Sequence, residues 1–175
     1  MRQFNLYFVL MAALSLLCGC QTDKNKSALG ILRVHIEAPA DKFGTTQTIS
    51  VIRAAPVMVS ISKEPILSES NVTAARLIDT PGGYAIEIQF DDANTLILEQ
   101  YSASNVGKHF AIFSQWGEKI TEGRWIAAPL ITHHLANGVL SFTPDVSREE
   151  AELIVSGLNN VAKKTHASGW RSLLQ

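Results

Sequence analysis

The chain has 175 residues, of which 46% are hydrophobic and 18% are charged, and its 15 Lys and Arg residues nearly balance its 16 Asp and Glu residues. This composition excludes a largely disordered chain and provides no strong net field to gather nucleic acid, so we expect one globular domain without a nucleic-acid partner. Both cysteines, Cys18 and Cys20, lie near the N-terminus, which excludes a disulfide or a cysteine-ligated metal in the rest of the chain.

The N-terminus predicts a signal peptide over residues 1–19. Arg2 precedes an apolar run over residues 6–17, which is shorter than the roughly 20 residues of a membrane-spanning helix. The alternative is a buried N-terminal helix. The run ends in Leu17-Cys18-Gly19-Cys20, which resembles the lipobox of bacterial lipoproteins. The resemblance implies cleavage before Cys20 and attachment of fatty acids, such as palmitate, to that residue.

The same resemblance predicts a location in the cell envelope. More than one acyl chain on Cys20 would anchor the protein stably to a membrane. Gln21 stands where an Asp would favour the inner membrane, so the periplasmic face of the outer membrane is favoured in a Gram-negative host. Residues 20–29 are mostly polar and form the expected lipidated tether.

The expected domain covers residues 30–165 and begins with strands. Leu32, Val34 and Ile36 alternate with polar residues, which is typical of a half-buried strand, and Pro39 ends it. Residues 49–54 and 57–61 predict a hairpin around Pro56. After a turn at 68–72, residues 76–79 and 84–90 predict two strands joined by a tight connection at 81–83. Their buried face is expected to hold Tyr84, Ile86, Ile88 and Phe90.

Two helices are expected among the remaining elements. Asp91 and Asp92 can cap a helix that runs through Tyr101. Strands are predicted over residues 106–116, 125–130 and 139–142. Ser147 and Glu150 form a capping-box pattern for a last helix, with an apolar stripe at Ala151, Ile154, Leu158 and Val161. We therefore predict an α+β fold, with a mixed or antiparallel sheet, two main helices packed on one face, and a C-terminal tail at 166–175.

Several segments together resemble the head subdomain of the first periplasmic domain of SecD, a part of the SecDF preprotein translocase. They are residues 68–75 (SESNVTAA), 83–90 (GYAIEIQF), 105–112 (NVGKHFAI), 126–131 (IAAPLI) and 142–158. The order of strands, helices and turns matches that family over about residues 68–158. A longer hairpin is expected here between Phe113 and Trp125. The resemblance implies a head that contacts exported or unfolded polypeptide, or an envelope complex.

No residue pattern predicts a catalytic site, a metal site or a cofactor, so we expect a non-enzymatic binding domain. His133 and His134 are adjacent and would point to opposite faces of a strand, which does not suit chelation. No Cys or carboxylate stands at a spacing typical of metal ligands from the other histidines, which are His35, His109 and His166. The tryptophans suit either a peptide groove or core packing, and they are Trp116, Trp125 and Trp170.

The sequence is also compatible with three other functions. One is a small-ligand carrier, which would show a closed apolar pocket. Another is a structural spacer in a larger assembly. The third is a cell-envelope hydrolase, whose carboxylates would come from Asp91, Asp92, Glu149 and Glu150 and would have to converge in one cleft.

Overall fold

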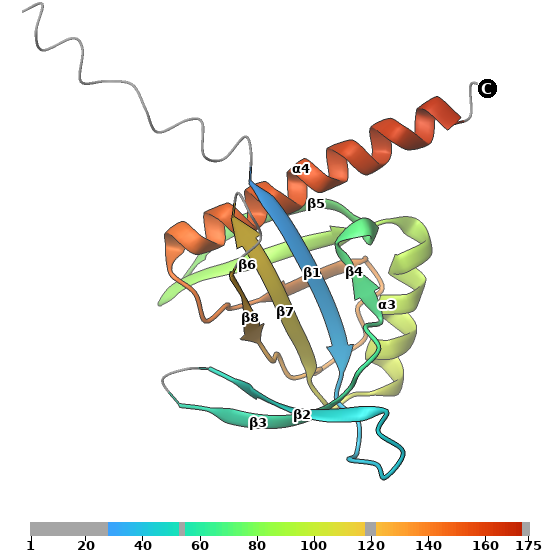
Figure 1. The fold of residues 1–175 in the computed structure, drawn as a ribbon, viewed down its shortest axis with the longest axis vertical. Coiled ribbons are helices and arrows are strands. Elements are labelled where there is room, and N and C mark those ends of the chain that lie inside the picture. Colours follow the sequence, from blue (N-terminus) through green and yellow to red (C-terminus); the bar gives the residue numbers. More distant parts are fainter. Residues whose placement is uncertain (1–27, 53–54, 118–121, 173–175) are drawn as a thin grey trace, which may run out of the picture.

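The computed structural model describes residues 28–52, 55–117 and 122–172 (Figure 1). The signal peptide, Cys18 and Cys20 lie outside these residues. The fold is α+β, as predicted, and every strand pairing is antiparallel. The strands are divided among three sheets, because the hairpin predicted around Pro56 forms a sheet of its own.

The first sheet has the order β4-β1-β7-β8. Its strands are β1 (Leu29–Ile36), β4 (Leu67–Ser68), β7 (Phe110–Gly117) and β8 (Glu122–Ala127). The predicted alternation is confirmed in β1, where Leu32, Val34 and Ile36 point into the core. Strand β7 begins later than predicted, because residues 105–108 form a turn in which Lys108 N donates to Asn105 O. Strand β8 begins and ends earlier than predicted.

The second sheet has the order β5-β6-β9 and crosses behind the first in Figure 1. Its strands are β5 (Val72–Thr80), β6 (Gly83–Phe90) and β9 (Val139–Phe142), and a 3₁₀ turn, η2 (Glu69–Asn71), precedes β5. Ile86, Ile88 and Phe90 are buried as predicted, whereas Tyr84 packs at the margin of the core. The main core is therefore enclosed between the two sheets and the helices.

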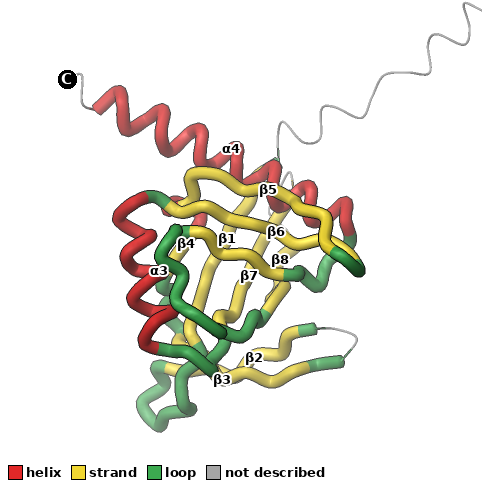
Figure 2. The backbone as a smooth tube through the Cα atoms, turned by 180° about the vertical axis from the view of Figure 1, so that it is seen from behind, coloured by secondary structure: helices red, strands yellow, loops and turns green. Residues whose placement is uncertain are grey.

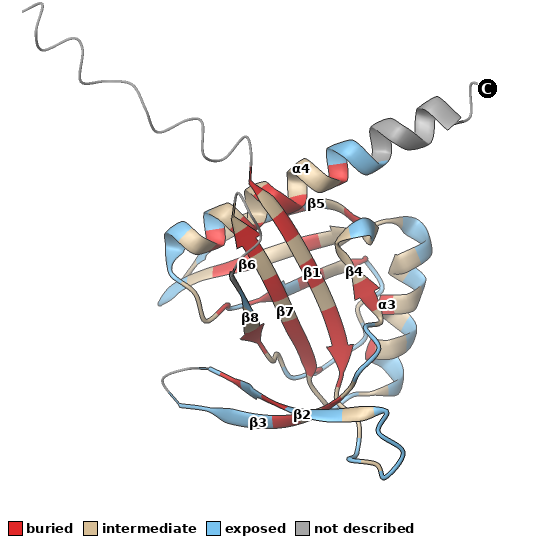
Figure 3. Ribbon diagram, in the orientation of Figure 1, coloured by how far each residue is buried: buried red, intermediate tan, exposed pale blue. Residues whose placement is uncertain are grey.

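The third sheet is the hairpin of β2 (Thr46–Val51) and β3 (Val57–Ser62). It crosses the end of the first sheet at which β1 ends and β7 begins (Figure 3), and its inner side packs on the outer face there. There it forms a second, smaller core, made by Ile49, Val51, Val59 and Ile61 against Ala111. On β7 this small core includes Ala111, which is paired with His35, and Trp125 and Ala128 pack beside it, so the hairpin lies over the end of the sheet at which β1 ends. A groove lies beside the hairpin, where its end meets the part of the first sheet that it does not cover.

Helices α3 and α4 complete the described part of the domain (Figure 2). Helix α3 (Asp92–Ser104) begins at Asp91, whose Oδ1 accepts a hydrogen bond from Asn94 N at 2.8 Å. Helix α4 (Arg148–Ser172) begins with the predicted capping box, since Ser147 N donates to Glu150 Oε2 at 2.7 Å and Glu150 N donates to Ser147 Oγ at 3.2 Å. Helix α4 runs through residues 166–172, which are part of the expected C-terminal tail at 166–175. A single Gly169 costs a helix only about 1 kcal/mol.

Candidate functional site

The four carboxylates of the hydrolase hypothesis are distributed over two helix starts. Asp91 caps α3 and Asp92 lies in its first turn, whereas Glu149 and Glu150 lie in the first turn of α4. Hydrogen bonds from its own amide and from the Ser147 side chain hold the pKa of Glu149 below its usual range. A general acid needs the opposite shift. This arrangement is that of helix capping.

The histidines occupy unrelated positions. His133 and His134 are exposed, and His133 Nδ1 lies 3.0 Å from Thr132 Oγ1. His35 is buried under the hairpin and His109 Nδ1 lies 2.6 Å from Glu37 Oε2. Within the described residues, no group of three or more His, Cys, Asp or Glu side chains could hold a metal ion. The side chain of His166 lies outside the described part.

The two described tryptophans belong to different layers. Trp116 is buried in the main core, and the Arg124 guanidinium lies 4.9 Å from its ring centroid. Trp125 is partly exposed on the outer face, in edge-to-face contact with His35 and Phe113. Trp125 therefore borders the groove and Trp116 does not. The side chain of Trp170 lies outside the described part.

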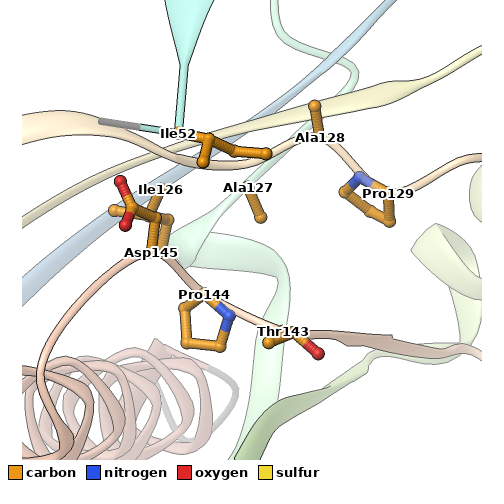
Figure 4. Close-up of a pocket in the computed structure, with 8 residues that line it drawn as sticks. All are labelled: Ile52, Ile126, Ala127, Ala128, Pro129, Thr143, Pro144 and Asp145. Carbon is orange, nitrogen blue, oxygen red and sulfur yellow. The ribbon is translucent and has the colours of Figure 1, made fainter. Parts of the chain in front are cut away.

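The groove consists of two hollows that share one residue, Ile52. We call it the hairpin groove. The first hollow has a volume of about 460 Å³ and is drawn in Figure 4, where Ile52 lies across from Pro144 and Thr143. Its lining residues are Ile52, Ile126, Ala127, Ala128, Pro129, Thr143, Pro144 and Asp145. The segment from Ile126 to Pro129 is part of the IAAPLI motif singled out in the sequence.

The second hollow lies on the outer face of the first sheet, beside the hairpin. It has a volume of about 330 Å³ and is lined by Ser50, Val51, Ile52, Phe113, Gly123, Arg124 and Trp125. Gly123 makes this surface flat, because a Cβ there would lie 2.4 Å from Gln115 Cγ and 3.0 Å from Phe113 Cζ. The neighbouring side chains can therefore lie over the backbone of β8.

Arg124, which lines the second hollow, is paired with Glu150 at the start of α4. Arg124 Nη2 donates to Glu150 Oε2 and to Asp145 O, both at 3.2 Å. Asp145 N donates to Ile126 O at 2.7 Å. These bonds connect the start of α4 to β8. Most of the residues that line the groove are aliphatic, aromatic or proline. Such a surface suits apolar side chains of a ligand.

Ile52 was not predicted as a site residue. It is 41% exposed and has a φ of 67°, which is a strained conformation for a β-branched residue. The sequence contains no signal for this conformation. Nor does it show that the hairpin would fold back over β7 and β8, since that contact joins segments far apart in the chain.

Comparisons with known proteins agree with this fold. The model of the SecDF P1 head subdomain family matches residues 46–162. The chain is similar to a solved structure described as a membrane component SecDF that enhances protein export, with a TM-score of 0.54 and 18% identity over 82% of this chain and 71% of that one. It is also similar to SecDF in a super-membrane-facing form, with a TM-score of 0.53 and 19% identity over 78% of this chain. It spans only 19% of that second protein. A comparison with curated protein sequences found no match.

Proposed function

This chain belongs to the SecDF P1 head subdomain family, and from that premise we propose that it is a lipid-anchored, non-enzymatic envelope protein that binds exported polypeptide before it folds. The solved relative is described as a component that enhances protein export. The observation that carries the proposal here is the hairpin groove, an open surface bordered by Ile52, Phe113 and Trp125, which is mainly apolar in its first hollow and of mixed polarity in its second. Unfolded polypeptide exposes the apolar side chains that such a surface can cover.

The shape of the groove favours polypeptide over a small ligand. A small-molecule carrier usually surrounds its ligand in one closed cavity, whereas these two hollows are open and meet at Ile52. Together they extend from Phe113 and Gly123 to Thr143 and Pro144. An extended chain can follow such a path and place several side chains in it.

Membrane attachment is proposed from the lipobox-like sequence that ends at Cys20. None of the helices that the structure describes is long and apolar enough to cross a membrane. Fatty acids on Cys20 would hold the domain at the membrane surface, and the family relationship supports a position on the side where exported chains emerge. The outer membrane remains our expectation for a Gram-negative host.

Binding can be tested with reduced and carboxymethylated α-lactalbumin, a chain that stays unfolded. In fluorescence anisotropy, we expect the purified domain to bind this unfolded probe and not to bind native α-lactalbumin. Thr143→Arg should weaken binding about tenfold, because it places a long charged side chain in the first hollow. Thr132→Arg is the matched control, since Thr132 is exposed outside the hairpin groove. Absence of binding, or equal effects of the two substitutions, would refute the proposal.

A further inference from the structure

Within the described residues the three sheets have six edge strands, and five of them are short or carry a hydrogen bond from another segment. Unprotected edges attract other strands, so proteins cover or shorten them. In the first sheet, β4 has only two residues, and the carbonyl of Ile126 in β8 is bonded to Asp145 N. In the hairpin sheet, the carbonyl of Ser60 in β3 accepts from Ala38 N at 2.9 Å.

The second sheet is protected in a comparable way. The Asn159 side chain accepts from Ala75 N at 2.9 Å and donates to Ala75 O at 2.8 Å, so it occupies the position of a pairing strand on β5. Strand β9 has only four residues, and Val139 N donates to Asn137 Oδ1 at 3.1 Å.

Strand β2 is the exception. Its sequence, TQTISV, has no charge, no proline and no glycine, which are the residues that usually discourage pairing at an edge. Within the described residues, its only strand partner is β3. Strand β2 therefore has the composition and the exposure of a pairing edge.

The register shows which backbone groups this edge presents. Thr48 is opposite Ser60, and the Ser60 carbonyl points away from β2 to Ala38. Because the N–H and C=O groups of opposite residues in a non-hydrogen-bonded pair both point outward, Thr48 presents its own backbone groups to the free edge. Ser50, two residues along, does the same.

The second hollow of the hairpin groove lies at the C-terminal end of β2. It is bounded by Ser50 and Val51 on the hairpin and by Phe113 and Gly123 on the first sheet. A strand added to β2 would direct alternate side chains into this hollow and the others to solvent. Backbone pairing and apolar contact would therefore act on the same segment.

We propose that β2 receives one extended segment of a partner polypeptide as an added strand, paired through the backbone of Thr48 and Ser50, with alternate apolar side chains over Phe113 and Gly123. This inference rests on the proposed function and specifies how the unfolded chain is held. The absence of charge in β2 means that the preferred segment is uncharged and alternates apolar with small polar residues.

A second copy of this chain does not fit the same edge. Strands β7 and β8 continue past the hairpin, as the position of Phe113 and Gly123 in the second hollow shows. If β2 of a second copy paired with β2 here, the first sheet of the second copy would overlap with β7 and β8 of this copy. A single extended strand needs only about 5 Å of width beside β2.

The test uses a fluorescein-labelled peptide of alternating threonine and valine. Thr48→Pro removes one outward N–H, and proline is tolerated on an edge where that group faces solvent. Thr48→Val keeps the N–H and the β-branched shape. We expect Thr48→Pro to weaken peptide binding at least about tenfold and Thr48→Val to leave it unchanged. In the unsubstituted protein, the peptide should slow hydrogen exchange at the amides of Thr48 and Ser50.

The outcomes separate this inference from the proposed function. If unfolded α-lactalbumin binds and Thr143→Arg weakens it, but Thr48→Pro has no effect and the Thr48 and Ser50 amides exchange at the same rate with peptide, strand addition is wrong and the proposed function stands. If neither probe binds, both are wrong. The exchange measurement decides the matter even if Thr48→Pro fails to fold.

Discussion

Gly30 of β1 and Gly157 of α4 are packed backbone against backbone. A Cβ on Gly157 would lie 2.6 Å from Gly30 N, and a Cβ on Gly30 would lie 2.9 Å from Leu158 N. The neighbouring atoms are main-chain atoms and cannot rotate away. This contact sets how closely the last helix approaches the first strand of the domain.

Substitution of Gly157 by alanine should therefore destabilise the domain, although alanine is the better helix former. We expect a loss of about 1–3 kcal/mol in the free energy of unfolding, since the added methyl group overpacks the contact. Urea denaturation followed by circular dichroism measures it. Gly83→Ala is the control, because no atom lies within 4 Å of a Cβ there. An equally small effect of both substitutions would contradict the assigned contact.

Replacement of Asn159 by alanine should expose the edge of β5. The change leaves the Ala75 N–H and C=O groups without their amide partner, which costs about 1–3 kcal/mol when such groups stay buried. We also expect greater self-association in light scattering, because a second edge becomes available for pairing. Asn159→Asp keeps one acceptor for Ala75 N but places a carboxylate oxygen near Ala75 O, so it should not restore stability. Full stability of either variant would rule out the edge role.

The stability of the domain should fall as the pH drops below 6.5. Burial lowers the pKa of His35 from 6.5, aided by the charge of Arg33 and opposed by the hydrogen bond to the Ser62 carbonyl. The His35 side chain therefore binds a proton more readily in the unfolded chain than in the folded protein. The stability that is present above the His35 pKa of the unfolded chain is lost as the pH falls from that pKa through the lower His35 pKa of the folded protein.

His35→Gln removes this titration and can keep a donor toward Ser62 O. Its melting temperature should depend less on pH than that of the unsubstituted protein between pH 6.5 and the lower pKa of folded His35. A second loss, below pH 4.5, is expected from Glu37, whose pKa is lowered chiefly by its hydrogen bond with His109. Parallel pH profiles for the His35→Gln variant and the unsubstituted protein would contradict the assignment to His35.

Acylation at Cys20 can be tested in a bacterial host. We expect the mature protein to begin at Cys20 with fatty acids attached and to enter the detergent phase on Triton X-114 partition. Cys20→Ser should abolish both, whereas Cys18→Ser should leave both intact. Mass spectrometry distinguishes the species. A mature protein without added fatty acid would refute the anchor while leaving the groove proposals open.

Local features of the domain were predictable because their causes are local. The alternation in β1 and β6, the Asp91 cap and the Ser147–Glu150 capping box depend on residues close together in the chain. No local pattern marks the end of α4, which continues through Gly169.

Long-range relationships were not predictable from any of these patterns. Asn159 and Ala75 are separated by 84 residues, and neither carries a signal for the other. The folding of the hairpin across β7 and β8 creates the groove at Ile52, and it depends on the second core around Ile49 and Ala111.

Sequence alone therefore determined the alternation within β1 and β6, the helix starts, the family resemblance and the expected anchor, since each depends on neighbouring residues or a short motif. Tertiary structure alone decided which edge of which sheet stays open and what lies beside it. That outcome depends on the packing of distant side chains and on hydrogen bonds across the fold, whose partners are matched by shape and position and not by separation along the chain.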